Sequence, residues 1–210
     1  SFTRGYPRTT AFFEGRWYFG GTRILPKSWY GSAVNNVLYF DDSQGLPADA
    51  LSGTFDGGSI ITGMYAGRSL QLFTASGEFR FIKQPGDPIV PGDVPRKQTE
   101  YGSAKIRPVG IDGATIFVQR TGKSIRDFKF DINEDSYNSL SLSSLAPHLV
   151  NDVVDVAAWN GSRTDEISLV FVVNGDGTMA VLNTRREAEV RAWTQWYTGS
   201  GATVDNDTGA

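Results

Sequence analysis

Short β-strand signals separated by glycine-containing turns recur along the whole chain, and this recurrence restricts the fold more than any other feature. The strand signals are short runs in which apolar side chains either alternate with polar ones or follow one another. They occupy residues 12–13 with 16–19, and residues 69–73, 79–82, 114–118, 125–130, 167–173 and 179–184. The run over 167–173 is nearly continuous, which is typical of a strand in a core.

Two kinds of glycine turn give these strands a repeat. The first kind contains Gly15, Gly67 and Gly113, with successive separations of 52 and 46 residues. The second kind contains Gly77, Gly122 and Gly177, with successive separations of 45 and 55 residues. Glycine suits such turns because it accepts the positive φ angles that tight hairpins need. Each unit therefore consists of a strand, a turn, a strand, a turn, an alternating strand and a long link.

This period and strand content are typical of the blades of a β-propeller. We predict an all-β fold of β-propeller-like repeats, with about four blade-like units in an incomplete propeller and one short helix. A β-sandwich remains the alternative, since its strands and turns have similar patterns. We expect residues 1–198 to form this domain and residues 199–210 to be a flexible tail or a truncated next repeat. The chain does not begin with Met and ends in polar residues, so we expect a fragment of a longer chain.

Two segments interrupt the strand pattern. Leu142, Leu145 and Leu149 have a helical spacing, which predicts a helix of one or two turns that ends near Pro147. The stretch 84–96 contains four prolines, and we expect it to be a long loop that connects two units.

Composition excludes several classes of site. The 210 residues include no Cys and a single His, which rules out disulfides, Cys-based zinc sites and three-histidine metal centres. The net charge of -3 is not that of a protein that grips nucleic acid tightly. No apolar run approaches the roughly 20 residues of a membrane helix, and no signal peptide is evident.

The residues that could carry chemistry fit structural roles better. His148 is the only possible imidazole base, but no serine lies in a nucleophile-elbow pattern, and His148 is expected to cap a short helix or to bond a backbone carbonyl. The carboxylates fall mostly at turns, where Asp bonds its own backbone; they are Asp41, Asp42, Asp49, Asp56, Glu134, Asp135, Asp152, Asp155, Asp165 and Glu166. The segment 205–209 lacks the ligands of a calcium loop, and Gly122-Lys123-Ser124 is a hairpin turn and not a phosphate loop. We expect no catalytic residue, cofactor or metal.

The tryptophans allow two interpretations. Trp17, Trp29, Trp159, Trp193 and Trp196 could stack against sugars or anchor a subunit interface. For most of them, filling the core between packed sheets is the better interpretation. Trp29 is the one that we expect to be partly exposed, since it is followed by Tyr30 and Gly31.

A set of segments, taken together, resembles a known family. The segments are 13–21, 28–32 with 39–41, 73–79, 101–103, 117–123, 145–149 and 189–193. In this order and spacing they resemble a family of tailed-bacteriophage and prophage structural proteins, the tail-nozzle or tail tubular protein B-like proteins, related to packaged-DNA stabilisation proteins. The resemblance extends over residues 6–199 and corresponds to a central portion of longer chains. The positions that match family motifs are Trp17, Trp29, Gly31, Gln119, Arg120, Gly122, Pro147, His148 and Trp193.

The resemblance implies a virion protein without catalysis, assembled in the host cytoplasm and carried in the tail. Such proteins form a ring, commonly a hexamer, below the portal and adaptor, and they contact the adaptor and other tail proteins. The ring helps retain packaged DNA and lets it pass during ejection, without tight binding and without a membrane partner. We expect the motif positions to be packing and turn residues, and the loops 41–58 and 84–100 to carry contacts between subunits.

Two other functions stay open. One is a carbohydrate-binding or glycoside-cleaving β domain, suggested by the aromatic residues and the carboxylates. The other is a host propeller that binds cellular proteins.

Overall fold

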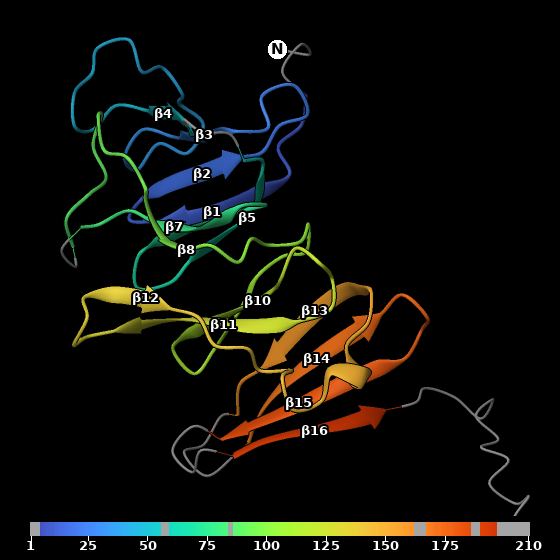
Figure 1. The fold of residues 1–210 in the computed structure, drawn as a ribbon. Coiled ribbons are helices and arrows are strands. Elements are labelled where there is room, and N and C mark those ends of the chain that lie inside the picture. Colours follow the sequence, from blue (N-terminus) through green and yellow to red (C-terminus); the bar gives the residue numbers. More distant parts are fainter. Residues whose placement is uncertain (1–4, 56–58, 84–85, 162–166, 186–189, 197–210) are drawn as a thin grey trace, which may run out of the picture.

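The computed structural model describes residues 5–55, 59–83, 86–161, 167–185 and 190–196. In this part of the chain, sixteen strands form four four-stranded antiparallel sheets, and the one helix is a single 3-10 turn. Figure 1 shows the four sheets stacked in chain order, from the blue N-terminal sheet to the orange and red C-terminal sheet. The prediction of an all-β fold with four blade-like units and one short helix is therefore confirmed.

Each sheet is a meander of consecutive strands. Sheet 1 has the order β1 (Thr9–Phe13), β2 (Arg16–Gly20), β3 (Ser28–Gly31), β4 (Leu51–Thr54). Sheet 2 has the order β5 (Ile61–Ala66), β6 (Leu70–Thr74), β7 (Gly77–Arg80), β8 (Arg96–Thr99). Sheet 3 has the order β9 (Val109–Ile111), β10 (Ala114–Val118), β11 (Ile125–Asp131), β12 (Ser136–Asn138). Sheet 4 has the order β13 (Val153–Trp159), β14 (Ser168–Asn174), β15 (Met179–Arg185), β16 (Val190–Trp196).

The glycine turns fall at equivalent places in these meanders. Turns of the first kind join the first and second strands of sheets 1, 2 and 3, and turns of the second kind join the second and third strands of sheets 2, 3 and 4. Gly15, Gly113, Gly122 and Gly177 have positive φ, as the turns require. Gly77 is needed for a different reason, because a Cβ there would lie 2.5 Å from the carbonyl oxygen of Thr99 in β8.

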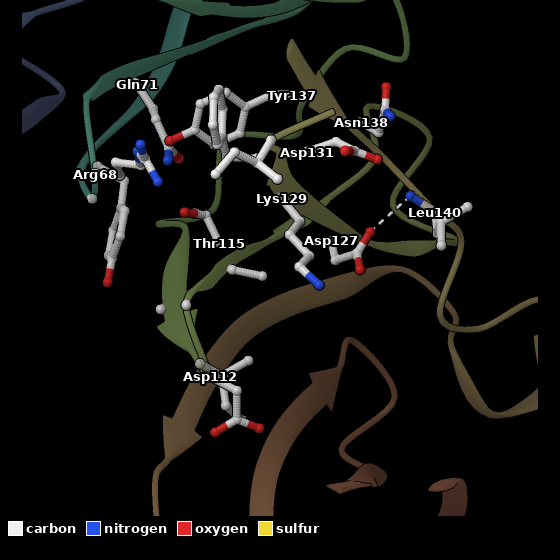
Figure 2. Close-up of a pocket in the computed structure, with 18 of the residues that line it drawn as sticks. Arg68, Gln71, Asp112, Thr115, Asp127, Lys129, Asp131, Tyr137, Asn138 and Leu140 are labelled. Carbon is white, nitrogen blue, oxygen red and sulfur yellow. Dashed lines mark hydrogen bonds between the residues drawn. The ribbon is translucent and has the colours of Figure 1, made fainter. Parts of the chain in front are cut away.

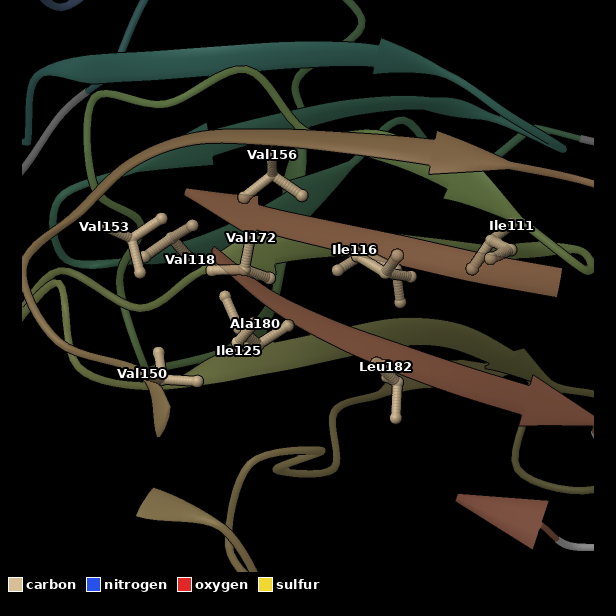
Figure 3. Packing of buried hydrophobic residues seen from close by; sticks show 11 residues of the cluster. Ile111, Ile116, Val118, Ile125, Val150, Val153, Val156, Val172, Ala180 and Leu182 are labelled. Carbon is tan, nitrogen blue, oxygen red and sulfur yellow. The ribbon is translucent and has the colours of Figure 1, made fainter. Parts of the chain in front are cut away.

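Three hydrophobic clusters hold the stack together. Between sheets 1 and 2 the cluster includes Tyr18, Trp29, Leu70, Leu72 and Phe81. Between sheets 2 and 3 it is aromatic, formed by Phe73, Phe117, Phe128 and Tyr137. Between sheets 3 and 4 it is aliphatic (Figure 3), and Ile116, Val118, Ile125, Val170, Val172 and Leu182 are among its members. Burial of these side chains between sheets is the main stabilising contribution.

Two predictions about the links are wrong. The proline-rich stretch 84–96 does not connect two units, since it joins β7 to β8 within sheet 2. The error arose because β8 is short and polar, so its sequence gave no strand signal. The helix begins at Pro147 rather than ending near it, as the 3-10 turn Pro147–Leu149. Proline fits a first helical position, where its missing N–H is no loss. Residues 199–210 lie outside the described residues.

Candidate functional site: a cleft between sheets 2 and 3

An open cleft of about 1040 Å³ lies between sheets 2 and 3. Three hairpins surround it, and each comes from the same end of its sheet (Figure 2). The hairpin β5–β6 contributes Gly67 and Arg68, β9–β10 contributes Asp112 and Gly113, and β11–β12 contributes residues 131–133. Strands β6, β10 and β11 supply the floor, so the cleft is built on regular structure.

A glycine allows the two sheets to approach at one wall of this cleft. Tyr65 in β5 reaches across to β9, where a Cβ on Gly110 would lie only 1.7 Å from the Tyr65 hydroxyl oxygen. A side chain at position 110 would therefore push sheet 3 away from sheet 2. The sequence alone does not mark Gly110 as important, because Tyr65, the residue that it accommodates, lies in another repeat.

The cleft is lined by polar groups that can bind a ligand through hydrogen bonds. Gln71 is buried, and its side-chain oxygen has no hydrogen-bond partner among the described residues. Asp127 accepts a 2.7 Å hydrogen bond from the Leu140 N–H, and the Arg68 guanidinium lies 4.5 Å from the centroid of the Phe130 ring. Figure 2 shows Gln71, Thr115 and Lys129 around the same space.

The lining residues include no His or Cys, so no pair of nucleophile and imidazole base is available there. Among all described residues, no group of three or more His, Cys, Asp or Glu side chains could hold a metal ion. Sequence reasoning missed Arg68, Gln71, Thr115 and Lys129 as a group, because they come from three different strands and one hairpin and share no motif.

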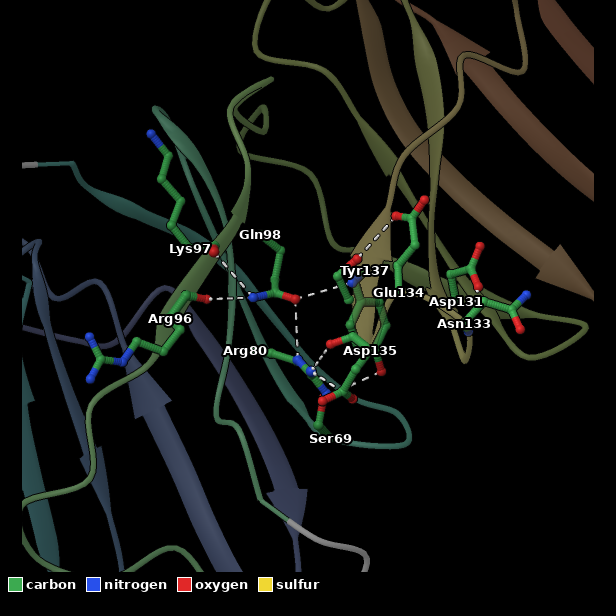
Figure 4. Close-up of polar contacts among 11 residues, drawn as sticks. Ser69, Arg80, Arg96, Lys97, Gln98, Asp131, Asn133, Glu134, Asp135 and Tyr137 are labelled. Carbon is green, nitrogen blue, oxygen red and sulfur yellow. Dashed lines mark hydrogen bonds and ion pairs between the residues drawn. The ribbon is translucent and has the colours of Figure 1, made fainter.

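A buried polar network fixes the position of sheet 3 against sheet 2 beside the cleft (Figure 4). Arg80 in β7 donates to the backbone oxygen of Asp135 at 2.7 Å and to the side-chain oxygen of Gln98 at 3.2 Å. The same Gln98 oxygen accepts the Tyr137 N–H at 3.1 Å. Because Arg80 is almost fully buried, these bonds replace its lost hydration. The network thus sets one wall of the cleft.

A buried carboxylate lies on the same strand pair of sheet 2, β7 and β8, as Arg80 and Gln98. Glu78 is fully buried and accepts a short hydrogen bond from the Thr99 hydroxyl. Its second oxygen has no hydrogen-bond partner among the described residues. Burial is the main reason that the pKa of Glu78 is raised above its ordinary value, although hydrogen bonds to Thr99 and to the backbone of Tyr101 and Gly102 oppose the shift.

Two motif positions in sheet 1, Trp29 and Gly31, lie on its inner face, and the expectation that Trp29 is partly exposed is wrong. Trp29 is not exposed, since only 3% of its surface is accessible. It fits inside because it lies over Gly53 of β4, where a Cβ would approach its ring to 2.5 Å. Gly31 gives similar room to the Tyr18 ring. Trp17 lies on the opposite face of the sheet, half-buried, and its ring stacks on Phe12.

The other motif positions lie around sheets 3 and 4. Gln119, Arg120 and Gly122 form the turn between β10 and β11, where Arg120 donates its N–H to the Gly102 oxygen at 2.9 Å. His148 follows Pro147 in the exposed 3-10 turn. Trp193 in β16 donates from its indole to the Leu142 oxygen at 2.9 Å. These positions are spread over the molecule and do not converge on the cleft.

Most of the described carboxylates that were expected at turns lie in turns or loops, but Asp155 lies inside β13. Asp41 accepts the Ser43 N–H, and Asp49 accepts the Leu46 N–H. Asp135 and Asp152 have positive φ, which Asp tolerates in turns. Asp56, Asp165, Glu166 and the segment 205–209 lie outside the described residues.

Comparison with known proteins assigns no family. No family model matches the chain, and no curated protein matches it. Within the described residues, no helix combines the length and apolarity that crossing a membrane requires.

Proposed function

We propose that this chain is a non-enzymatic structural component of a tailed-phage or prophage virion. In this proposal it belongs to the tail nozzle at the head-to-tail region, where copies form a ring around the DNA channel. The ring helps to retain packaged DNA and to release it, and it contacts the adaptor and other tail proteins. The chain is carried in the tail after assembly in the host cytoplasm.

The observation that carries the proposal is that the sheets at both ends of the stack have apolar side chains on their outer face as well as on their inner face. Trp17 and Phe19 lie on the outer face of sheet 1, and Leu169 and Phe171 on the outer face of sheet 4. Large apolar patches on a surface mark places where other protein surfaces bind. This supports a building block of an assembly.

The family resemblance gives the assembly its identity in this proposal. The resembling segments 13–21, 73–79 and 117–123 coincide with the hairpin of β1 and β2, the hairpin of β6 and β7, and the turn after β10. These are positions where a shared fold would need shared residues. A net charge of -3 also suits a channel through which DNA must pass without strong phosphate contacts.

Mass spectrometry of purified particles tests the proposal. Particles induced from the source strain would be quantified for this chain against the major capsid protein. We expect the chain at a few copies per particle. Its absence from particles that contain portal and capsid proteins would refute the virion role.

A second candidate function is carbohydrate binding, which the cleft between sheets 2 and 3 favours. Aromatic rings of Tyr65, Phe130 and Tyr137 line it beside the amide oxygen of Gln71, which has no hydrogen-bond partner in the described part of the chain. Rings and hydrogen-bonding groups are the combination that small polar ligands require. A glycan array would show saturable binding that Gln71→Leu abolishes, and a blank array would exclude this function.

A further inference from the structure

The second strands of the two end sheets have the apolar composition of strands that are covered on both faces. In β14, Val170 and Val172 pack against sheet 3, while Leu169, Phe171 and Val173 alternate with them on the other face. A strand with one face in water normally alternates apolar with polar residues, and a continuous apolar run is typical of a strand covered on both sides. The open face of sheet 4 is therefore apolar along β14, while Asp155, Asn183 and Thr194 lie on the same face in the neighbouring strands.

The inner sheets of the same chain provide the comparison. In β6, Leu70 and Leu72 pack toward sheet 1, while Phe73 packs toward sheet 3. In β10, Ile116 packs toward sheet 4 and Phe117 toward sheet 2. The second strands of the end sheets follow the same two-sided pattern, although one of their faces has no sheet against it in the described structure.

The open face of sheet 1 is aromatic and hollowed. Five rings contact one another there, with neighbouring centroids between 5.1 and 6.1 Å apart; they belong to Phe12, Trp17, Phe19, Tyr30 and Phe40. A groove of about 1090 Å³ runs over this face, and Trp17, Phe19, Tyr30 and Phe40 are among its lining residues. Phe12, in β1, is 64% exposed.

The open face of sheet 4 presents large side chains. Trp159 in β13 and Trp196 in β16 are each 47% exposed. The ring of Trp196 lies 5.7 Å from that of Phe171, between centroids, in an edge-on arrangement. One end of the stack thus has a groove lined by aromatic residues, and the other end has indole rings that could enter such a groove.

We propose that these two faces bind each other between copies of this chain, so that sheet 4 of one copy stacks on sheet 1 of the next. Within the chain, the first strand of a sheet contacts the first strand of the next sheet, since β1 contacts β5 and β9 contacts β13. Continuing this arrangement places β13 of one copy beside β1 of the next, with Trp159 near Phe12. The contact is heterologous, the type that closes into rings.

The inference deepens the proposed function and rests on it in one respect, that copies of the chain associate. It places the contacts between copies on the open faces of the end sheets, whereas the sequence led us to expect them in the loops 41–58 and 84–100. The two proposals can fail separately. The virion role is judged by the composition of particles, whereas the pairing of faces is judged on the purified 210-residue chain.

Two charged variants test the pairing of faces. Phe12→Lys places a cation on the open face of sheet 1, and Trp159→Asp places a carboxylate on the open face of sheet 4. Both residues are substantially exposed, so each variant should keep its fold, which circular dichroism and thermal melting would verify. Leu145→Lys is the matched control, since Leu145 is 88% exposed in the link between β12 and the 3-10 turn, outside both faces.

Sedimentation velocity over a concentration series gives the readout. We expect the wild type and Leu145→Lys to self-associate, and each face variant alone to associate at least about tenfold more weakly. An equal mixture of the two face variants should associate again, because one wild-type junction and one junction between opposite charges can form. A monomeric wild type would overturn the proposal. So would unchanged association of Phe12→Lys alone, since that result places the contact outside the open face of sheet 1.

Discussion

The most informative single substitution concerns Arg16, which fastens the long loop of sheet 1. Arg16 lies in β2 and is 1% exposed. Its guanidinium donates at 2.6 Å to the carbonyl oxygens of Ser32 and Pro47, and also to that of Asp49. The link between β3 and β4, residues 32–50, is therefore held to the sheet by one cation.

Replacing Arg16 with Met removes all three bonds while keeping a long side chain. A hydrogen bond to a charged group contributes about 1.5–3 kcal/mol, but the variant also avoids the cost of burying the cation. Pro47 is exposed and Asp49 is half-buried, so water can reach their carbonyls, whereas that of Ser32 stays buried. We expect a net loss of about 2–4 kcal/mol in the free energy of unfolding, equivalent to roughly 5–15 °C in Tm.

Urea denaturation and limited proteolysis would measure this effect. Arg8→Met is the matched control, because Arg8 is exposed and the chemical change is the same; its effect should stay within about 0.5 kcal/mol. Arg16→Met should also make residues 32–50 more susceptible to protease. Equal stability of the two variants would refute the role assigned to Arg16.

Three further changes test other parts of the account. Gly31→Ala would place a Cβ 2.7 Å from the buried Tyr18 ring, and calorimetry should show a loss of about 1–3 kcal/mol from overpacking. Phe73→Ala empties a position whose ring lies 5.2 Å from Phe117 and 5.6 Å from Phe128; a loss of about 3–5 kcal/mol is expected, against little change for Leu145→Ala. The raised pKa of Glu78 means that the folded protein holds its proton more tightly than the unfolded chain. Wild-type stability should therefore fall relative to Glu78→Gln as pH rises from below the ordinary Glu value of 4.5 through the raised pKa. A pH-independent difference between these two proteins would contradict that assignment.

The sequence predicts the repeat well because its signals are local. Gly15 and Gly113 mark two-residue hairpins in which the preceding residue, Glu14 or Asp112, also has positive φ. Alternation or continuous apolar character identifies β6, β10, β11 and β14 correctly. The fourth strands were missed, because β8 and β12 are short and polar and are defined by pairing with their neighbours.

What could not be predicted depends on contacts between repeats. Trp29 is buried because Gly53 lies opposite it on a strand that gave no signal. The cleft exists because Tyr65 meets Gly110 across two sheets, and its polar lining is assembled from residues 65 to 160. Such positions have no common motif, so neither the cleft nor the open faces could be found before the sheets were placed.

Labelling of intact particles tests the central claim most directly. An antibody raised against residues 41–48, an exposed part of the sheet 1 loop, would be visualised on purified phage by electron microscopy. The account predicts label at the short tail, at one vertex of each particle. Label spread over the capsid, or no label on particles with intact tails, would contradict the assignment to the tail nozzle.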